Sequence, residues 1–129
     1  MGRYQQPERS SEVQRHAQAT AVRAFVDDVL AVDRRARVVV LGDLNDFEFS
    51  QTADILVGSG RTALIDLPRT LPASERYTYV YEGNSQVLDH ILVSQGLRKR
   101  LSYDVVHTNA EFADQDSDHD PQVVRLSVR

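Results

Sequence analysis

The sequence predicts an α+β (mixed α/β) fold, with one long helix packed on a mainly antiparallel sheet. Two observations predict it. Apolar residues recur at helical spacing from Ser11 to about Val32, and several later segments are short, apolar or alternating. We expect residues 1–10, which are polar, to form a flexible N-terminal segment. Residues 11–129 then form a single domain.

The size and composition suit one globular domain. The chain has 129 residues, of which 41% are hydrophobic and 26% are charged. A net charge of -4 provides no global attraction for nucleic acid or membranes, so phosphate binding would need metal ions or local arginines. The absence of cysteine excludes disulfides, zinc–thiolate sites and thiol catalysis. We find neither a signal-peptide core nor a run of about 20 apolar residues. These features do not select one cellular compartment over another.

The long helix is predicted to begin at Ser10 or Ser11, because a serine side chain caps the free N–H groups of a first turn. Its apolar residues recur three and four positions apart, which is typical of an amphipathic helix. These residues are Val13, Ala17, Ala21, Ala24, Phe25, Val29 and Leu30. A second helix is predicted from Ser50 to about Val57, and Gly58 ends it.

The strands are predicted from apolar and alternating segments. Residues 37–41 are almost wholly apolar, which favours a central strand covered on both faces, and residues 63–67 indicate a short buried segment. The other expected strands span residues 77–81, 86–94, 102–108 and 122–128. The first two of these form a hairpin that turns at 82–85. An acidic loop at 109–120 separates the last two.

Asp43 and Asn45 follow the first apolar strand, directly after Gly42. Because they are two residues apart, their side chains point the same way in extended backbone. An aspartate can bind a metal or orient a water, and an asparagine amide can donate to a phosphoryl oxygen. The alternative is an ordinary turn, in which Asn45 adopts a left-handed backbone.

Asp118 and His119 lie at the end of the acidic loop, just before the last strand. Adjacent side chains diverge, so Asp118 can bind a metal ion while His119 presents a ring nitrogen to a substrate oxygen. The alternative is a solvated loop whose carboxylates mostly face water. The other carboxylates of this loop are Glu111, Asp114, Asp116 and Asp120. Calcium binding here is a further alternative, although the central glycine and closing glutamate of a calcium loop are absent.

Asp89 lies in an apolar strand, where a carboxylate costs free energy unless it is paired. A role in orienting His119 would pair Asp89 and raise the pKa of the histidine. The alternative is an edge strand on which Asp89 faces water. His90 points to the opposite face, so we expect a structural or surface role for it. His107 ends a strand and has no neighbouring ligand pattern.

Tyr77, Tyr79 and Tyr81 alternate along one strand and therefore share a face. Such a row can stack on nucleic-acid bases. A cross-strand aromatic ladder explains the same spacing, and we favour that interpretation.

Three motifs together resemble the endonuclease/exonuclease/phosphatase, or DNase I-like, superfamily. They are Val-Val-Val-Leu-Gly-Asp-Leu-Asn-Asp at 38–46, Leu-Asp-His-Ile-Leu-Val-Ser at 88–94 and Ser-Asp-His-Asp-Pro at 117–121. The resemblance implies a four-layer α/β sandwich made of two similar halves, of which this chain matches the C-terminal half. It is closest to bacterial secreted nucleases, which makes a secreted parent protein an expectation of the resemblance alone.

The resemblance also implies a role for each matching position. Asp43 would orient or deprotonate the attacking water, and Asn45 would hold a phosphoryl oxygen. Asp118 would bind the divalent metal, Mg²⁺ or Mn²⁺. His119, oriented by Asp89, would contact the scissile phosphate. The implied reaction is in-line attack of water on a phosphoester.

The resemblance does not extend to the family's first half, which carries an Asn, a metal-binding Glu and an Asn-x-His motif. We therefore expect a parent protein that is a metal-dependent phosphodiesterase, a nuclease acting on nucleic acid. This chain would be weakly active or inactive without the missing N-terminal half or a second copy. A phosphomonoesterase or phospholipid phosphodiesterase of the same fold is one alternative. A non-catalytic half-domain that binds a partner or itself is another.

Overall fold

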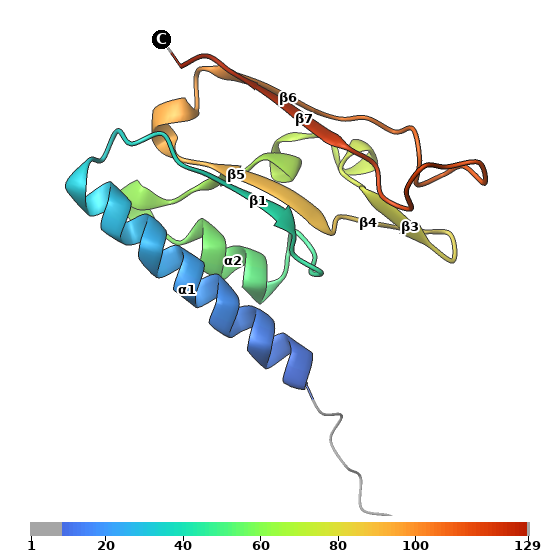
Figure 1. Cartoon of the computed structure of the whole chain (residues 1–129), viewed down its shortest axis with the longest axis horizontal. Helices are drawn as coiled ribbons and strands as arrows, with labels where there is room; N and C mark the ends of the chain where they lie inside the picture. Colours follow the sequence, from blue (N-terminus) through green and yellow to red (C-terminus); the bar gives the residue numbers. More distant parts are fainter. Residues whose placement is uncertain (1–8, 129) are drawn as a thin grey trace, which may run out of the picture.

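The computed structural model describes residues 9–128 and confirms the mixed α+β class (Figure 1). Most of the expected flexible segment lies outside the described residues, and Ser10 already belongs to a helix. The described strands pair only antiparallel, but they form a three-stranded sheet and two two-stranded sheets instead of the single sheet expected. In this part of the chain, no helix has the length and apolar character needed to cross a membrane.

Helix α1 spans Ser10–Val32, as predicted, but its cap and its buried face differ from the expectation. The N-cap residue is Arg9 and makes no side-chain cap, so the predicted serine cap is wrong. Val13 and Phe25, expected to face the core, are 67% and 69% exposed. The face that packs on the rest of the protein consists of Ala19, Arg23, Val26 and Leu30.

The buried Arg23 explains this choice of face. Its guanidinium donates to the carbonyl oxygens of Leu56, Val57 and Thr62 at 3.2, 3.1 and 2.9 Å, and it also pairs with Asp27. These carbonyls lie at and just after the C-terminal end of the second helix, where backbone acceptors have no partner within the helix. Arg23 therefore joins α1 to the end of that helix.

Helix α2 spans Gln51–Val57 and has the predicted boundaries. The Ser50 hydroxyl accepts a hydrogen bond from the Ala53 N–H at 3.2 Å, which caps the first turn. Gly58 ends the helix at a φ of 69°, a left-handed backbone that glycine adopts without steric cost.

The three-stranded sheet has the order β1–β5–β2, with β1 at Val39–Asp43, β5 at Asp89–Val93 and β2 at Ile65–Asp66. The first apolar strand is therefore an edge strand among residues 9–128, not the central strand we expected. Leu41 shows the consequence, since it is 67% exposed. The central position belongs to β5, whose residues from His90 onward are buried.

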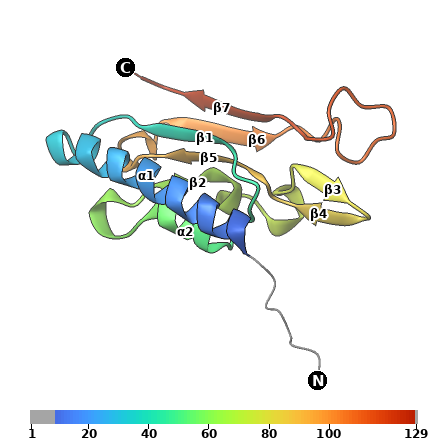
Figure 2. The same ribbon diagram turned by 60° about the horizontal axis from the view of Figure 1, so that its bottom comes forward.

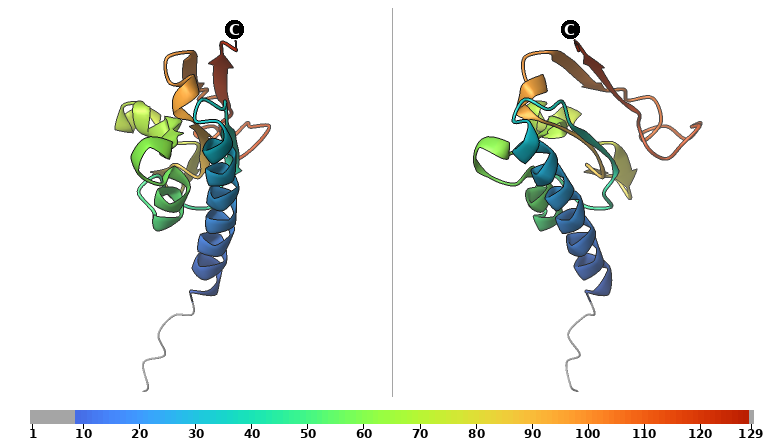
Figure 3. Two further views of the ribbon diagram at one scale, coloured as in Figure 1. Left: turned by 90° about the vertical axis from the view of Figure 1, so that its left-hand side faces the viewer. Right: turned by 60° about the vertical axis from the view of Figure 1, so that its left-hand side comes forward.

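The two faces of this sheet are covered by different elements (Figures 2 and 3). Leu92 packs with α1 and α2 on one face. Ile91 and Val93 pack on the other face with the ribbon formed by β6 at Leu101–Val105 and β7 at Gln122–Leu126. Asp89 is in phase with Ile91 and Val93, so the strand alternation places it on the ribbon side.

The hairpin is shorter than predicted. Strands β3 at Tyr79–Tyr81 and β4 at Asn84–Gln86 pair with each other, but residues 89–93 pair instead with β1 and β2. The expected single returning strand at 86–94 is therefore wrong. Thr78 accounts for the break, because its buried hydroxyl accepts hydrogen bonds from the N–H groups of Leu88 and Asp89 at 3.3 and 3.2 Å.

The role of Arg23 is testable by denaturation. Arg23→Met removes the donor to three carbonyls, so we expect the free energy of unfolding to fall by about 2–4 kcal/mol. Asp27→Asn is the matched control and should change stability little, since that carboxylate is half exposed. Urea denaturation followed by circular dichroism measures both variants. Equal losses would mean that the ion pair, not the carbonyl contacts, stabilises the helix packing.

Candidate active site

Three strand ends bring polar side chains to one place. Asp43 ends β1 and lies directly opposite Asp89, the first residue of β5. His119, from the loop before β7, reaches the same place through a bridge between its backbone and that of Tyr79. One ligand atom from each of Asp43, Asp89 and His119 lies within 4.8 Å of the others. Residues far apart in the sequence therefore form one acidic cluster with an imidazole.

The Asp89–His119 pair is the shortest side-chain contact of this cluster. The His119 Nδ1 lies 2.6 Å from the Asp89 Oδ2. A carboxylate only accepts, so Nδ1 carries the proton and Nε2 points to the other side of the ring. Partial burial disfavours the charged ring, but the hydrogen bond and charge of Asp89, with the charges of Asp43 and Asp118, raise the pKa of His119. The ring therefore holds its positive charge to a higher pH than an ordinary histidine.

Asp43 and Asn45 form a turn in place of the extended backbone that we expected. The Asn45 N–H donates to the Asp43 Oδ1 at 2.8 Å, and Asn45 has a φ of 50°. This is the left-handed alternative, so the inference that the two side chains point the same way in extended backbone is wrong. The turn holds the Asp43 carboxylate at the strand end. The Asn45 side chain is exposed, and its expected role at a phosphoryl oxygen stays a prediction.

Asp118 lies beside the cluster and not within it. Its side chain is 71% exposed, and its Oδ1 is 4.0 Å from the His119 Nε2. Its carboxylate is thus close to the free side of the imidazole. Its expected role as a metal ligand stays a prediction.

A hollow of about 240 Å³ opens beside the two carboxylates of the cluster. Its walls include Asp43 and Asp89 on the sheet and Pro121 and Gln122 at the start of β7. On the hairpin side, the Tyr79 ring lies over His119 with the ring centres 5.0 Å apart. Tyr79 also stacks on Tyr81 at 6.5 Å within β3, while the partners of these two residues across the hairpin are Gln86 and Asn84 and not aromatic residues. The cluster is therefore accessible on one side and enclosed on another.

Asp120 differs from the other carboxylates of the acidic loop, because it is almost wholly buried. Its Oδ1 accepts hydrogen bonds from the N–H groups of Thr108, Asn109 and Ala110 at 2.7–3.0 Å. Its Oδ2 lies 2.9 Å from the Nδ1 of His107. Burial opposes the charged carboxylate, but these hydrogen bonds outweigh it and lower the pKa of Asp120. His107 therefore has a partner that the sequence did not indicate.

These contacts fix the base of the acidic loop next to His119. The Asp120 N–H donates to the Thr78 carbonyl oxygen at 2.7 Å, and the Asn109 amide donates to the His119 carbonyl oxygen at 3.0 Å. Thr78 thus holds Asp89 through its hydroxyl and Asp120 through its carbonyl. The backbone on both sides of the Asp89–His119 pair is positioned by one buried residue.

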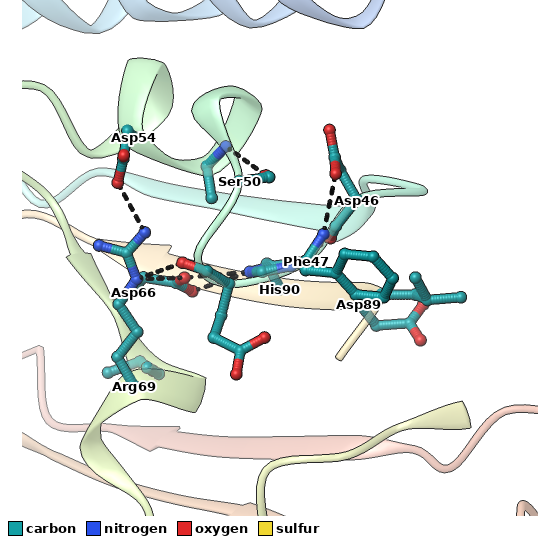
Figure 4. Close-up of polar contacts among 12 residues, drawn as sticks. Asp46, Phe47, Ser50, Asp54, Asp66, Arg69, Asp89 and His90 are labelled. Carbon is teal, nitrogen blue, oxygen red and sulfur yellow. Dashed lines mark hydrogen bonds and ion pairs between the residues drawn. The ribbon is translucent and has the colours of Figure 1, made fainter. Parts of the chain in front are cut away.

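A second polar network lies beneath the turn after β1 (Figure 4). The buried His90 ring contacts both Asp66 carboxylate oxygens at 3.1 Å through Nδ1, and its Nε2 lies 3.0 Å from the Asp46 carbonyl oxygen. Burial opposes a charge on this ring, but the bonds to Asp66 and Asp46 raise the pKa of His90. Arg69 extends the network from Asp66 to Asp54 on α2. The structural role expected for His90 agrees with this arrangement.

Asp46 connects this network to the cluster. Its carboxylate accepts hydrogen bonds from the Arg15 side chain at 3.2 Å and from the Thr52 hydroxyl at 2.7 Å. Burial opposes its charge, but these contacts and the bond from the Phe47 N–H lower the pKa of Asp46. The segment that follows Asp43 is therefore held from both helices and from the sheet.

A family model described as Endonuclease/Exonuclease/phosphatase family matches residues 3–121. The chain belongs to this family. Neither a curated protein nor a solved structure matches it. Membership of the endonuclease/exonuclease/phosphatase family indicates phosphoesterase or nuclease activity in general, and the family is typically metal-dependent. The cluster of Asp43, Asp89 and His119 is a site of suitable chemistry for such an activity.

Sequence reasoning missed the residues that support this cluster. Thr78, Asp120 and the His90–Asp66 pair hold the site from behind, yet none belongs to it. Thr78 carried one usable signal, since it is the polar residue that faces away from the tyrosines in an alternating strand. For Asp120 there was no such signal, because four other carboxylates of the same loop are exposed.

The Asp89–His119 pair predicts a specific pH dependence. Because the pKa of His119 is raised on folding, the pair stabilises the fold fully below the ordinary histidine pKa of about 6.5. That contribution is lost as the pH rises through the pKa of the folded state. NMR titration of the ring should show a lower His119 pKa in Asp89→Asn. In Asp43→Asn the shift should be smaller, since Asp43 acts through charge alone, and equal shifts would contradict the assigned hydrogen bond.

Asp120 should be a stability residue. We expect Asp120→Ala to lower the free energy of unfolding by about 2–4 kcal/mol, because three N–H groups lose their acceptor. The pKa of Asp120 is lowered on folding, so its contribution is present above the ordinary aspartate pKa and is lost as the pH falls through the folded value. The exposed Asp118→Ala is the control. Urea denaturation at several pH values would reject this role if both variants unfold alike.

Proposed function

We propose that this chain takes part in metal-dependent hydrolysis of phosphodiester bonds, and that the parent protein is a nuclease. The observation that carries the proposal is the convergence of Asp43, Asp89 and His119, with both carboxylates lining an accessible hollow. Two carboxylates attract a divalent cation, and a positively charged imidazole attracts an anionic oxygen. Family membership supports the reaction class but not the particular substrate.

The donor atoms at the site fit Mg²⁺ or Mn²⁺. Both ions prefer oxygen ligands, and the Asp43 and Asp118 carboxylates are exposed at the cluster. The His119 Nδ1 is occupied by Asp89, which argues against that nitrogen as a ligand. We therefore assign Asp118 to the cation. A bound divalent cation would neutralise charge on a phosphoryl group.

The protein residues then have distinct tasks. Asp43 is an exposed carboxylate that can accept a proton from water, while Asn45 offers an exposed amide to a phosphoryl oxygen. His119, charged and oriented by Asp89 through Nδ1, keeps its Nε2–H for another partner. That N–H can stabilise a developing negative charge or donate a proton to the leaving oxygen. The calcium alternative for the acidic loop would not use this arrangement.

We also propose that residues 11–129 correspond to the C-terminal half of the family domain and need a covering partner. Within residues 9–128, β1 pairs only with β5, which leaves its outer edge open. A hollow of about 210 Å³ between β1 and α1 is bordered by Leu41 and Val22, both exposed apolar residues. An N-terminal half or a second copy of the chain would bury this edge.

The proposal is tested with the chain alone and with a chain that contains both halves. Mg²⁺- or Mn²⁺-dependent hydrolysis of plasmid DNA and of bis(p-nitrophenyl) phosphate is measured, with EDTA as a control. We expect His119→Ala and Asp118→Ala to lower kcat of the two-half chain by at least about a hundredfold. Asp116→Ala, another exposed carboxylate of the same loop, should keep full activity.

The outcomes separate the candidate functions. Unchanged turnover in Asp118→Ala would reject the metal assignment. A preference for p-nitrophenyl phosphate or a phospholipid head group over DNA would identify a phosphomonoesterase or phospholipid phosphodiesterase of the same fold. A folded chain that forms dimers in size-exclusion chromatography with light scattering, and shows no turnover with either metal, would support the non-catalytic half-domain.

A further inference from the structure

One end of the molecule is strongly basic although the chain as a whole carries a net charge of -4. Three segments meet there, namely residues 33–37 after α1, residues 94–100 before β6, and residues 125–128 at the end of β7 (Figure 1). Their contacts are direct. The Arg35 carbonyl oxygen lies against Gly96, the Arg37 guanidinium donates to the Val128 carbonyl, and the Ser127 N–H donates to the Arg100 carbonyl at 2.7 Å.

Few acidic residues accompany the cations of this end in the sequence. Asp33 is the sole acidic residue in the three segments, and its carboxylate accepts a hydrogen bond from the Arg35 N–H. Several side chains at this end make no hydrogen bond or ion pair within residues 9–128. These side chains are Arg34, Arg35, Arg98, Lys99 and Arg125.

Arginines elsewhere in the described chain behave differently. With the exception of Arg61, each binds a carboxylate or a backbone carbonyl. These arginines are Arg9, Arg15, Arg23, Arg69 and Arg76. Intramolecular pairing of cationic side chains is therefore the rule in the described chain, and the five side chains of the basic end named above depart from it.

The same end contains a hollow of about 500 Å³. Arg100, Ser102, Arg125 and Ser127 are among the residues that line it. Guanidinium and hydroxyl groups are the donors that bind backbone phosphates of nucleic acids. Leu101, Leu126 and Val128 complete the lining and offer apolar contact to a sugar or base.

We propose that this basic hollow is an anchoring site for the phosphate backbone of a nucleic acid. The inference rests on the proposed phosphodiesterase function, because it concerns the substrate of that reaction. It implies that the substrate is a polymer that extends beyond the phosphodiester that is cleaved. Strand β7 runs from Gln122 at the candidate active site to Arg125 at the basic hollow. At about 3.3 Å per residue the backbones of Gln122 and Arg125 are roughly 10 Å apart along the strand, and their side chains point to opposite faces of β7.

An anionic membrane is the competing partner for a basic surface. Peripheral attachment to lipid uses aromatic or long apolar side chains that enter the interface beside the basic ones. The segments 33–37, 94–100 and 125–128 contain no aromatic residue. The cations here are mostly arginines, which bind phosphate with two parallel hydrogen bonds. These features favour nucleic acid.

The test measures binding apart from catalysis. Fluorescence anisotropy follows a labelled 20-nucleotide single strand and its duplex as the chain is added in EDTA, at 50 to 200 mM salt. Arg98→Gln/Arg125→Gln removes two positive charges from the basic end. Arg9→Gln/Gln14→Glu lowers the net charge by the same amount at the far end of α1. Arg34→Gln/Lys99→Gln is a second basic-end variant, confined to turns, and circular dichroism checks that each variant folds.

We expect both basic-end variants to weaken binding at least about tenfold at 50 mM salt. The slope of the logarithm of the binding constant against the logarithm of the salt concentration should become shallower by about one for each phosphate that is no longer bound. The charge-matched control should stay within about twofold of the unsubstituted chain. Equal affinity of all variants, or no binding by the unsubstituted chain, would overturn the proposal. Binding to phosphatidylserine-containing vesicles with none to nucleic acid would overturn it as well. Hydrolysis of the small substrate bis(p-nitrophenyl) phosphate does not need this anchor. Absence of that hydrolysis would therefore count against the proposed function and not against the anchoring site.

Discussion

The antiparallel register of β1 with β5 places Asp43 opposite Asp89, and the site depends on that pairing. A slip of one residue would turn every side chain of one strand to the other face, and the two carboxylates would separate. The register is held by what lies on each side of β5. Leu92 is buried against the helices, while Ile91 and Val93 are buried under the β6–β7 ribbon. Core packing thus sets the geometry of polar groups at the strand ends.

A series of contacts that begins with Thr78 positions His119 next to the two carboxylates. That buried residue accepts from the backbone of Asp89 through its hydroxyl and from the backbone of Asp120 through its carbonyl. The Asp120 carboxylate then accepts hydrogen bonds from three N–H groups at the base of the acidic loop. A loop residue is in this way held almost as firmly as a strand residue. Such support is what a catalytic group needs if its orientation is to be maintained between turnovers.

Local pattern predicted most of the secondary structure but little of the support around the site. The limits of α2 followed from Ser50 and Gly58, because capping is decided by neighbours in sequence. The buried face of α1 could not be predicted, since it turns on Arg23 meeting carbonyls more than thirty residues away. The edge position of β1 was hidden too, because its apolar run is equally compatible with a covered central strand. Asp43, Asp89 and His119 were found through their motifs, whereas Asp120 is distinguished from its acidic neighbours only by tertiary contacts.

The two ends of the molecule have opposite electrostatic character. The hairpin end holds a cluster of carboxylates suited to a cation, and the other end holds Arg34, Arg35, Arg98 and Arg125, whose side chains make no hydrogen bond or ion pair within residues 9–128. A polyanion could therefore approach the basic end while a cation offsets the carboxylates at the reacting end. This separation of charge is compatible with a net charge of -4, because a net charge adds all positive and negative groups and does not show where they lie.

The central claim is that three distant strand ends form one divalent-cation site. It is tested most directly by adding Mn²⁺ in small steps to the ¹⁵N-labelled chain and recording which amide signals broaden first. We expect early broadening at Asp43, Asp89, Asp118 and His119, all reversed by EDTA. Broadening that begins in the acidic loop at residues 111–116 and leaves Asp43 and Asp89 unaffected would contradict it.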